Sequence, residues 1–180
     1  MKFLRRLCRD RSGTAAAEMA LITPVLLVLM FGSAELGNYF WKEHTLVKSV
    51  RDGARYAARQ SFTNFAACTG NVPSAVSDNT KLVVSKGALD PAADDLLPNW
   101  SGVSASCSGN PATGCFEVTM TCSPTAGGQS MTGIYSTTGS GAPVVTVVAR
   151  LPYQSILGSF GFRGVDMYLN ADSQAAVTGL

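Results

Sequence analysis

The sequence predicts an α+β fold in which one long N-terminal helix carries a small, mostly antiparallel β-sheet domain. Two observations lead to this prediction. Residues 14–34 form an apolar run whose only ionisable group is Glu18, and no proline interrupts residues 35–60. After Gln60 the composition shifts to glycine, serine, threonine, proline and asparagine, with short strand-like runs between turn clusters. We therefore divide the chain into a basic leader (1–13), a transmembrane and extended helix (14–61) and an extracytoplasmic β-rich domain (62–180).

The first half of the expected helix is long enough and apolar enough to cross a bilayer. The leader before it carries five basic residues and one acid, Asp10. Basic flanks remain on the cytoplasmic side of a membrane, so the part after the helix is expected outside the cytoplasm. Of the 14 basic and 12 acidic residues, nine and eleven follow the leader. This nearly neutral remainder argues against a nucleic-acid-binding surface.

The second half of the helix is expected to continue to about Gln60, which gives a rod of roughly 70 Å from Ala15. Apolar residues recur on it at helical spacing, namely Phe40, Val47, Val50, Ala54 and Ala57. A row of like charges, formed by Arg51, Arg55 and Arg59, is interpreted as a solvated face, with a docking strip for a partner helix as the alternative. Small residues either let other helices approach or pack on the chain's own domain; they are Gly32, Ala34, Gly37, Gly53, Ala54, Ala57 and Ala58.

The β-rich domain is expected to contain several short strands and one short helix. Asp90 and Pro91 have the residue types of a helix start, and that helix is expected to end near Leu97. The stretch 123–141 is rich in glycine, serine and threonine and is predicted to be a long exposed loop. The strand-like runs are Lys81–Ser85, Val103–Ser106, Phe116–Thr121, Val144–Pro152 and Asp166–Asn170.

Four cysteines follow the helix, at Cys68, Cys107, Cys115 and Cys122, whereas Cys8 lies in the leader. In an oxidising compartment four cysteines suggest two disulfides, which allow three pairings. Cys115 and Cys122 lie in one expected strand and should not pair with each other, which leaves two pairings open. Of these, we favour Cys107 with Cys115 and Cys68 with Cys122. Zinc is the rival interpretation, although a close C-x-x-C pair is missing from the sequence.

The sequence offers no candidate catalytic residue. His44 is the single histidine and follows the apolar run by about ten residues, a poor position for a Ser–His or Cys–His mechanism. Asp90, Asp94 and Asp95 lack the glycine and terminal glutamate of a calcium loop. We therefore expect neither an enzyme nor a bound metal or cofactor.

Glu18 is the unusual residue of the apolar run. A carboxylate there costs on the order of a few kcal/mol, so it needs a partner or hydration. If the chain were cut after Gly13, Thr14 would present a new α-ammonium group four residues before Glu18. Glu18 of one subunit would then pair with the terminal amine of a neighbouring subunit and favour the correct stagger in a helical assembly. The alternative is a lone glutamate hydrated at the cytoplasmic interface.

The stretch Gly13-Thr-Ala-Ala-Ala-Glu18-Met-Ala-Leu-Ile resembles the processing site of type IV prepilins of the tight-adherence (Tad/Flp) branch. Arg51-Asp-Gly-Ala-Arg-Tyr-Ala-Ala58 is similar to the corresponding stretch of the TadE-like pseudopilin family. The resemblance is strongest over residues 11–60, and residues 144–153 and 166–176 match the family's closing strands. Met19 departs from the pattern, because the family often has an aromatic residue after the glutamate.

The resemblance implies cleavage between Gly13 and Thr14 by a prepilin peptidase, and an assembly role for Glu18. It implies a minor pilin or pseudopilin of a Tad-type (type IVc) pilus, acting in pilus biogenesis and adhesion. The implied location is the bacterial inner membrane, single pass, with the C-terminal domain periplasmic or incorporated into an extracellular pilus. The implied partners are the prepilin peptidase, other Tad minor pilins, the Flp major pilin, the inner-membrane assembly platform and membrane lipid.

Two other interpretations remain open at the level of the sequence. Residues 21–31 have the character of a signal-peptide core, and Gly32-Ser-Ala34 offers small residues for a signal peptidase, which would release a secreted protein that begins at Glu35. Alternatively, the chain is an uncut, membrane-anchored extracytoplasmic binding domain, and Gly13 has no role in processing.

Overall fold

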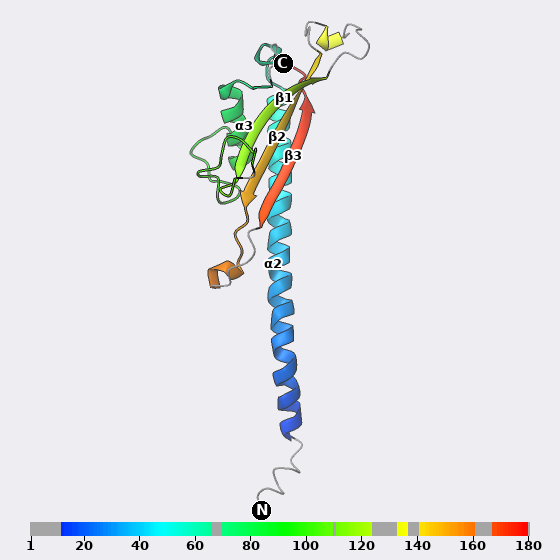
Figure 1. Cartoon of the computed structure of the whole chain (residues 1–180), viewed down its shortest axis with the longest axis vertical. Coiled ribbons are helices and arrows are strands. Elements are labelled where there is room, and N and C mark those ends of the chain that lie inside the picture. Colours follow the sequence, from blue (N-terminus) through cyan, green and yellow to red (C-terminus); the bar gives the residue numbers. More distant parts are fainter. Residues whose placement is uncertain are drawn as a thin grey trace, which may run out of the picture.

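The computed structural model describes residues 12–65, 70–109, 111–123, 133–136, 141–160 and 167–179. One helix, α2 (Ser12–Ala58), dominates the molecule with 47 residues. It stands as a rod, and the rest of the described chain packs around its C-terminal half (Figure 1). The predicted long helix is therefore confirmed, and a length of roughly 70 Å follows from 1.5 Å per residue.

The N-terminal half of α2 has no neighbours within the described chain. Large apolar side chains from Met19 to Phe31 are at least two-fifths exposed, and Leu21 reaches 78%. Within the described residues α2 is the one helix long and apolar enough to cross a membrane, and none of its most apolar stretch is buried in the protein. Water would oppose such exposure, so an apolar environment such as a bilayer is the fitting surrounding for residues 14–34, here called the apolar run.

A three-stranded antiparallel sheet covers one side of the outer half of α2. Its strands are β1 (Cys115–Ser123), β2 (Ala142–Pro152) and β3 (Tyr168–Ala176), in the order β1-β2-β3. The central strand alternates strictly between buried and half-buried residues, as a strand with one face on a core does. The three expected strands at 116–121, 144–152 and 166–170 are recovered, the last displaced toward the C-terminus.

Helix α3 (Ser74–Lys86) packs on α2 and corrects the strand predicted at Lys81–Ser85. Val76, Thr80 and Val84 recur every four residues and bury one face of the helix. The predicted strand rested on the adjacent β-branched residues Val83 and Val84, which give the segment 81–85 its strand-like character. The strand predicted at Val103–Ser106 is wrong as well: it is reduced to an isolated bridge between Ser104 and Cys115.

The helix predicted between Asp90 and Leu97 does not form. Its backbone groups bond instead to residues of α3. Leu96 N–H donates to the Ser85 carbonyl, and the Ala93 carbonyl accepts from the Lys86 ammonium. Asp90 accepts a hydrogen bond from Ala92 N–H in a local turn instead of capping a helix. Most of the loop predicted at 123–141 lies outside the described residues, and its described part includes a short 3₁₀ helix, η3 (Gly133–Tyr135).

The core lies between α2, α3 and the inner face of the sheet. Leu46, Val50, Ala54 and Ala57 of α2 are fully buried in it. The predicted apolar stripe is thus correct for its last three members, and Val47 is partly buried against the same core. Phe40 is 51% exposed because it precedes the region that the domain covers. The small residues divide in the same way: Gly53 and the three alanines after it pack on the chain's own domain, whereas Gly32 and Gly37 have nothing within 4 Å of a β-carbon position.

Candidate functional site

The predicted processing and assembly residues lie together on the first turns of α2. Gly13, Thr14 and Glu18 are all exposed, and a β-carbon on Gly13 would meet nothing within 4 Å. Thr14 and Glu18 are four residues apart and so lie on the same face of the helix. Within the described part of the chain, Glu18 has no hydrogen-bond or ion-pair partner. The site is thus open to a second molecule on every side that the structure describes.

The arginine row lies on the solvent side of α2. Arg51, Arg55 and Arg59 are exposed, and Arg55 makes an ion pair of 3.6 Å with Asp52 one turn earlier. Exposed pairs of this kind contribute little to stability. The row is therefore a solvated face, and its use as a partner strip stays a prediction.

The stretch Arg51–Ala58 carries exposed arginines on one face of α2 and is tightly packed on another. A β-carbon built on Gly53 would lie 2.3 Å from Val84 Cγ2, so α3 approaches α2 at a distance that only glycine allows. Ala54, Ala57 and Ala58 are buried next to it. The C-terminal end of the chain closes this region, since Thr178 N–H donates to the Ala58 carbonyl at 2.8 Å. The motif therefore joins the long helix to its domain.

Glu35, the residue that follows the apolar run, is the centre of a group of hydrogen bonds between α2 and the domain. Its carboxylate accepts a hydrogen bond of 2.8 Å from the Tyr153 hydroxyl. The N–H groups of Ile156 and Leu157 donate to the same carboxylate at 3.1 and 3.2 Å. The Glu35 side chain thus binds Tyr153, Ile156 and Leu157 of the segment that follows β2. These partners are 118 to 122 residues away along the chain, so no local signal pointed to them.

These contacts change the acidity of both partners. Burial raises the pKa of Glu35, but hydrogen bonds from Tyr153, Ser155, Leu157 and Ile156 outweigh this effect and hold its pKa below the ordinary value. Burial and the hydrogen bond to Glu35 raise the pKa of Tyr153, which therefore remains a protonated donor at neutral pH. A hydrogen bond that an ionised carboxylate accepts from a neutral donor is stronger than one between two neutral groups.

Aromatic and basic groups complete this contact between helix and domain. The rings of Tyr39 and Tyr153 meet edge to face with their centroids 5.2 Å apart. Asn38 donates to the Tyr153 hydroxyl at 2.8 Å. Lys42 donates to the Gln154 carbonyl at 2.9 Å, and its ammonium lies 5.1 Å from the centre of the Tyr153 ring. The helix face thus fixes the loop by several independent contacts.

Glu43, eight residues after Glu35 on α2, is a half-buried acid. Its Oε2 atom is buried and has no hydrogen-bond partner. Burial raises the pKa of this carboxyl, and a backbone hydrogen bond from Asn170 and the neighbouring His44 only partly oppose it. Sequence reasoning missed this residue, because its burial depends on packing against β3.

The predicted disulfide between Cys107 and Cys115 is present, with a Cα–Cα distance of 5.1 Å. It ties the loop before β1 to the first residue of that strand. Cys122 is also disulfide-bonded, and Cys68, its predicted partner, lies outside the described residues.

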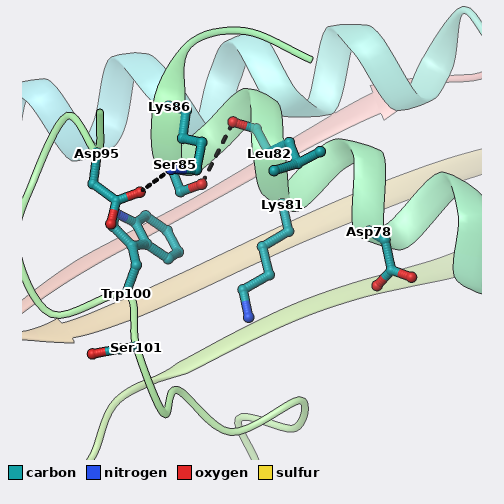
Figure 2. A pocket seen from close by; sticks show the side chains of 8 residues that line it. All are labelled: Asp78, Lys81, Leu82, Ser85, Lys86, Asp95, Trp100 and Ser101. Atoms are coloured by element: carbon teal, nitrogen blue, oxygen red, sulfur yellow. Dashed lines mark hydrogen bonds and ion pairs between the residues drawn. The ribbon is translucent and has the colours of Figure 1, made fainter. Parts of the chain in front are cut away.

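A shallow pocket lies between α3 and the segment around Trp100 (Figure 2). Lys86 and Asp95 form an ion pair of 3.2 Å at its edge, and the Nε1 atom of the buried Trp100 has no partner. Lys81 and Asp78 project along the same side of α3. Across the described residues, no group of three or more histidine, cysteine or acidic side chains is arranged to hold a metal ion. These residues do not form a recognisable catalytic arrangement.

Comparison with known proteins gives one match. Residues 13–55 match the family model described as TadE-like protein. This stretch begins at Gly13, contains Glu18, Glu35 and Gly53, and ends at Arg55. No curated protein and no solved structure matches the chain. The resemblance drawn from the sequence is thus confirmed for the helix, and it relates the chain to Tad pilus systems.

Proposed function

We propose that this chain, whose residues 13–55 are TadE-like, is a minor pilin or pseudopilin of a Tad-type pilus. It acts in pilus biogenesis and adhesion through assembly and not through catalysis. The observation that carries the proposal is the bare N-terminal half of α2, which exposes the apolar run with Glu18 as its only ionisable group. A helix of this kind needs lipid or other helices around it.

In this proposal the prepilin peptidase cuts between Gly13 and Thr14, on the exposed first turn of α2. The new amine of Thr14 then lies one turn from Glu18 and pairs with Glu18 of an adjacent subunit. A charge pair in an apolar environment favours one stagger between helices, because an unpaired charge there is costly.

The domain is held in the periplasm by a single membrane span, with the basic leader on the cytoplasmic side. The partners are the other Tad minor pilins, the Flp major pilin and the inner-membrane assembly platform. The exposed face that carries Arg51, Arg55 and Arg59 is available to them beyond the membrane.

The N-terminal residue of the membrane-purified protein tests this proposal. Intact mass is measured with and without the prepilin peptidase, for the natural chain and for two variants. Gly13→Ala should block cleavage, whereas Gly32→Ala, another exposed glycine of the same helix, should not. A peptidase-dependent start at Thr14 supports the pilin pathway.

Two results would contradict the proposal. A soluble product that begins at Glu35 would identify a secreted domain cut by a signal peptidase. An intact N-terminus in the membrane, unchanged by the peptidase, would identify an uncut, anchored binding domain.

A further inference from the structure

We propose that the segment Tyr153–Phe160, here called the β2–β3 loop, is a second membrane contact of this protein. The loop rests in the headgroup layer of the outer leaflet beside α2, so the domain touches lipid directly. This inference goes beyond the pilin assignment but rests on the proposed membrane anchorage of α2.

The first argument is the height of the loop along the helix. Glu35 directly follows the apolar run, and its carboxylate binds the Ile156 amide at 3.1 Å. This hydrogen bond places Ile156 at the level where α2 would leave the membrane. Figure 1 agrees, because the short helix η4 (Leu157–Phe160) is the part of the domain that extends furthest along α2 toward its N-terminus.

The second argument is the apolar surface at this level. On the loop side, Ile156 is 45% exposed and Met167, just before β3, is 41% exposed. On the other faces of α2, apolar side chains are also half exposed or more, namely Leu36, Phe40 and Trp41. Apolar groups thus surround the helix for roughly 10 Å beyond Ala34, at 1.5 Å per residue. Aromatic residues in such a position are typical of the headgroup level of a bilayer.

The third argument is that three consecutive backbone amides of the loop have side-chain acceptors. The amides of Ile156 and Leu157 bind Glu35, and the Gly158 amide binds Ser155 Oγ at 3.0 Å. A loop entering a poorly hydrated layer must satisfy its backbone groups in this way, since each unpaired one costs free energy. The same poorly hydrated layer explains why the Glu35 carboxylate, at the helix surface, accepts several hydrogen bonds.

Lys42 supplies the charge that a lipid surface attracts. Its ammonium lies in an open depression lined also by Gln154, Ser155 and Ile156. A lysine ammonium at this height, next to the Tyr153 ring, matches the phosphate level of a phospholipid. The occupant of this surface is therefore a phospholipid headgroup layer and not another polypeptide.

Depth-dependent quenching tests the inference with the full chain in vesicles of phosphatidylcholine and phosphatidylglycerol. An environment-sensitive fluorophore is attached to Ile156→Cys in a Cys8→Ser background, and some of the lipids carry a nitroxide. Met167→Cys provides a second position beside the loop, since the Tyr153 N–H donates to the Met167 carbonyl. Ile134→Cys in η3 is the matched control, because this isoleucine is 56% exposed and η3 lies at the far end of the domain (Figure 1).

We expect quenching at Ile156→Cys and Met167→Cys to exceed that at Ile134→Cys several-fold, and Glu35→Ala to reduce it at Ile156→Cys. Equal, weak quenching at the loop and control positions would overturn the inference. A blue-shifted but unquenched loop fluorophore would also overturn it, because a second protein and not lipid would then cover the loop. A label at Leu27→Cys separates the two proposals: if it is unquenched, membrane anchorage itself fails.

Discussion

Gly53 and Val84 hold the two main helices so close that a β-carbon on Gly53 would lie 2.3 Å from Val84 Cγ2. This contact sets the position of α3 on α2, and strands β2 and β3 of the sheet also pack on α2. The domain is therefore built around the end of α2 and shares its core with it. A single glycine within the TadE-like segment decides whether that packing is possible.

Gly53→Ala should destabilise the domain by about 1–3 kcal/mol, because an added methyl group in a close-packed contact forces a shift of side chain or backbone. Urea unfolding of the full chain in detergent, followed by near-UV circular dichroism, measures the change. Gly37→Ala is the control, since that glycine is exposed with nothing within 4 Å, and alanine there should be neutral or stabilise by up to ~1 kcal/mol. Equal effects of the two substitutions would refute the packing argument.

Removal of the Cys107–Cys115 disulfide should lower the free energy of unfolding by about 2–3 kcal/mol, the loop-closure entropy for a separation of eight residues. The variant Cys107→Ser with Cys115→Ala tests this, because Cys115 is buried and a hydroxyl there would be costly. Substitution is preferable to a reductant, since Cys122 is disulfide-bonded as well. An unchanged urea midpoint would show that the bond does not stabilise the fold.

Glu35 should protect the amides of Ile156 and Leu157 from hydrogen exchange at neutral pH. Because its folded pKa is lowered, the stabilisation is present above the ordinary value of 4.5 and is lost as the pH falls below it. Exchange rates, corrected for intrinsic pH dependence, should therefore show protection at pH 7 that declines in acid. Glu35→Ala should abolish this protection, and Glu18→Ala, which removes an exposed carboxylate from the same helix, should leave it intact.

The contribution of Glu43 to stability should depend on pH in the opposite direction to that of Glu35. The pKa of Glu43 is raised by burial, so ionisation opposes folding and stability falls as the pH rises through and above 4.5. Glu43→Gln keeps an acceptor for the Asn170 amide and removes the charge. We expect the variant to unfold at a higher temperature than the natural chain at pH 7 and to differ little from it at pH 4. A destabilising effect at pH 7 would show that the carboxylate has a partner in solution.

Glu18→Ala should leave membrane insertion intact and impair pilus assembly, because the substitution removes the charge that we propose sets the stagger between helices. Membrane fractionation and counts of surface pili measure the two effects. Glu18→Gln separates charge from shape: it should fail as the alanine variant does. Normal piliation of both variants would contradict the assembly role.

The long helix and three strands were predictable because their patterns are local. The central strand alternates along eleven residues, and the apolar run extends over 14–34 without a break, so neighbouring positions alone decide their structure. The segment 81–85 was predicted wrongly as a strand, because Val83 and Val84 favour strands in isolation. In the folded chain, the close packing of Val84 against Gly53 favours a helix there.

The candidate site was predictable only at its N-terminal end. Gly13, Thr14 and Glu18 form a sequence motif, and their pattern needs no tertiary contact to be seen. Glu35 and Glu43 owe their properties to β2, β3 and the loop between them, more than 100 residues later in the chain. Nothing within a few residues of either glutamate indicates such a partner.

The absence of any break in α2 between its bare half and its domain half makes the helix a stiff shaft. A turn or pull applied to the helix beyond Pro24 reaches the domain through uninterrupted helix, without being absorbed by a hinge. Inserting one residue in the helix between Ala34 and Leu46 would rotate one half against the other by about 100° and lengthen the shaft by about 1.5 Å. The direction in which the domain faces is thus set by the number of residues in the helix, and a filament that binds the shaft also orients what the domain presents.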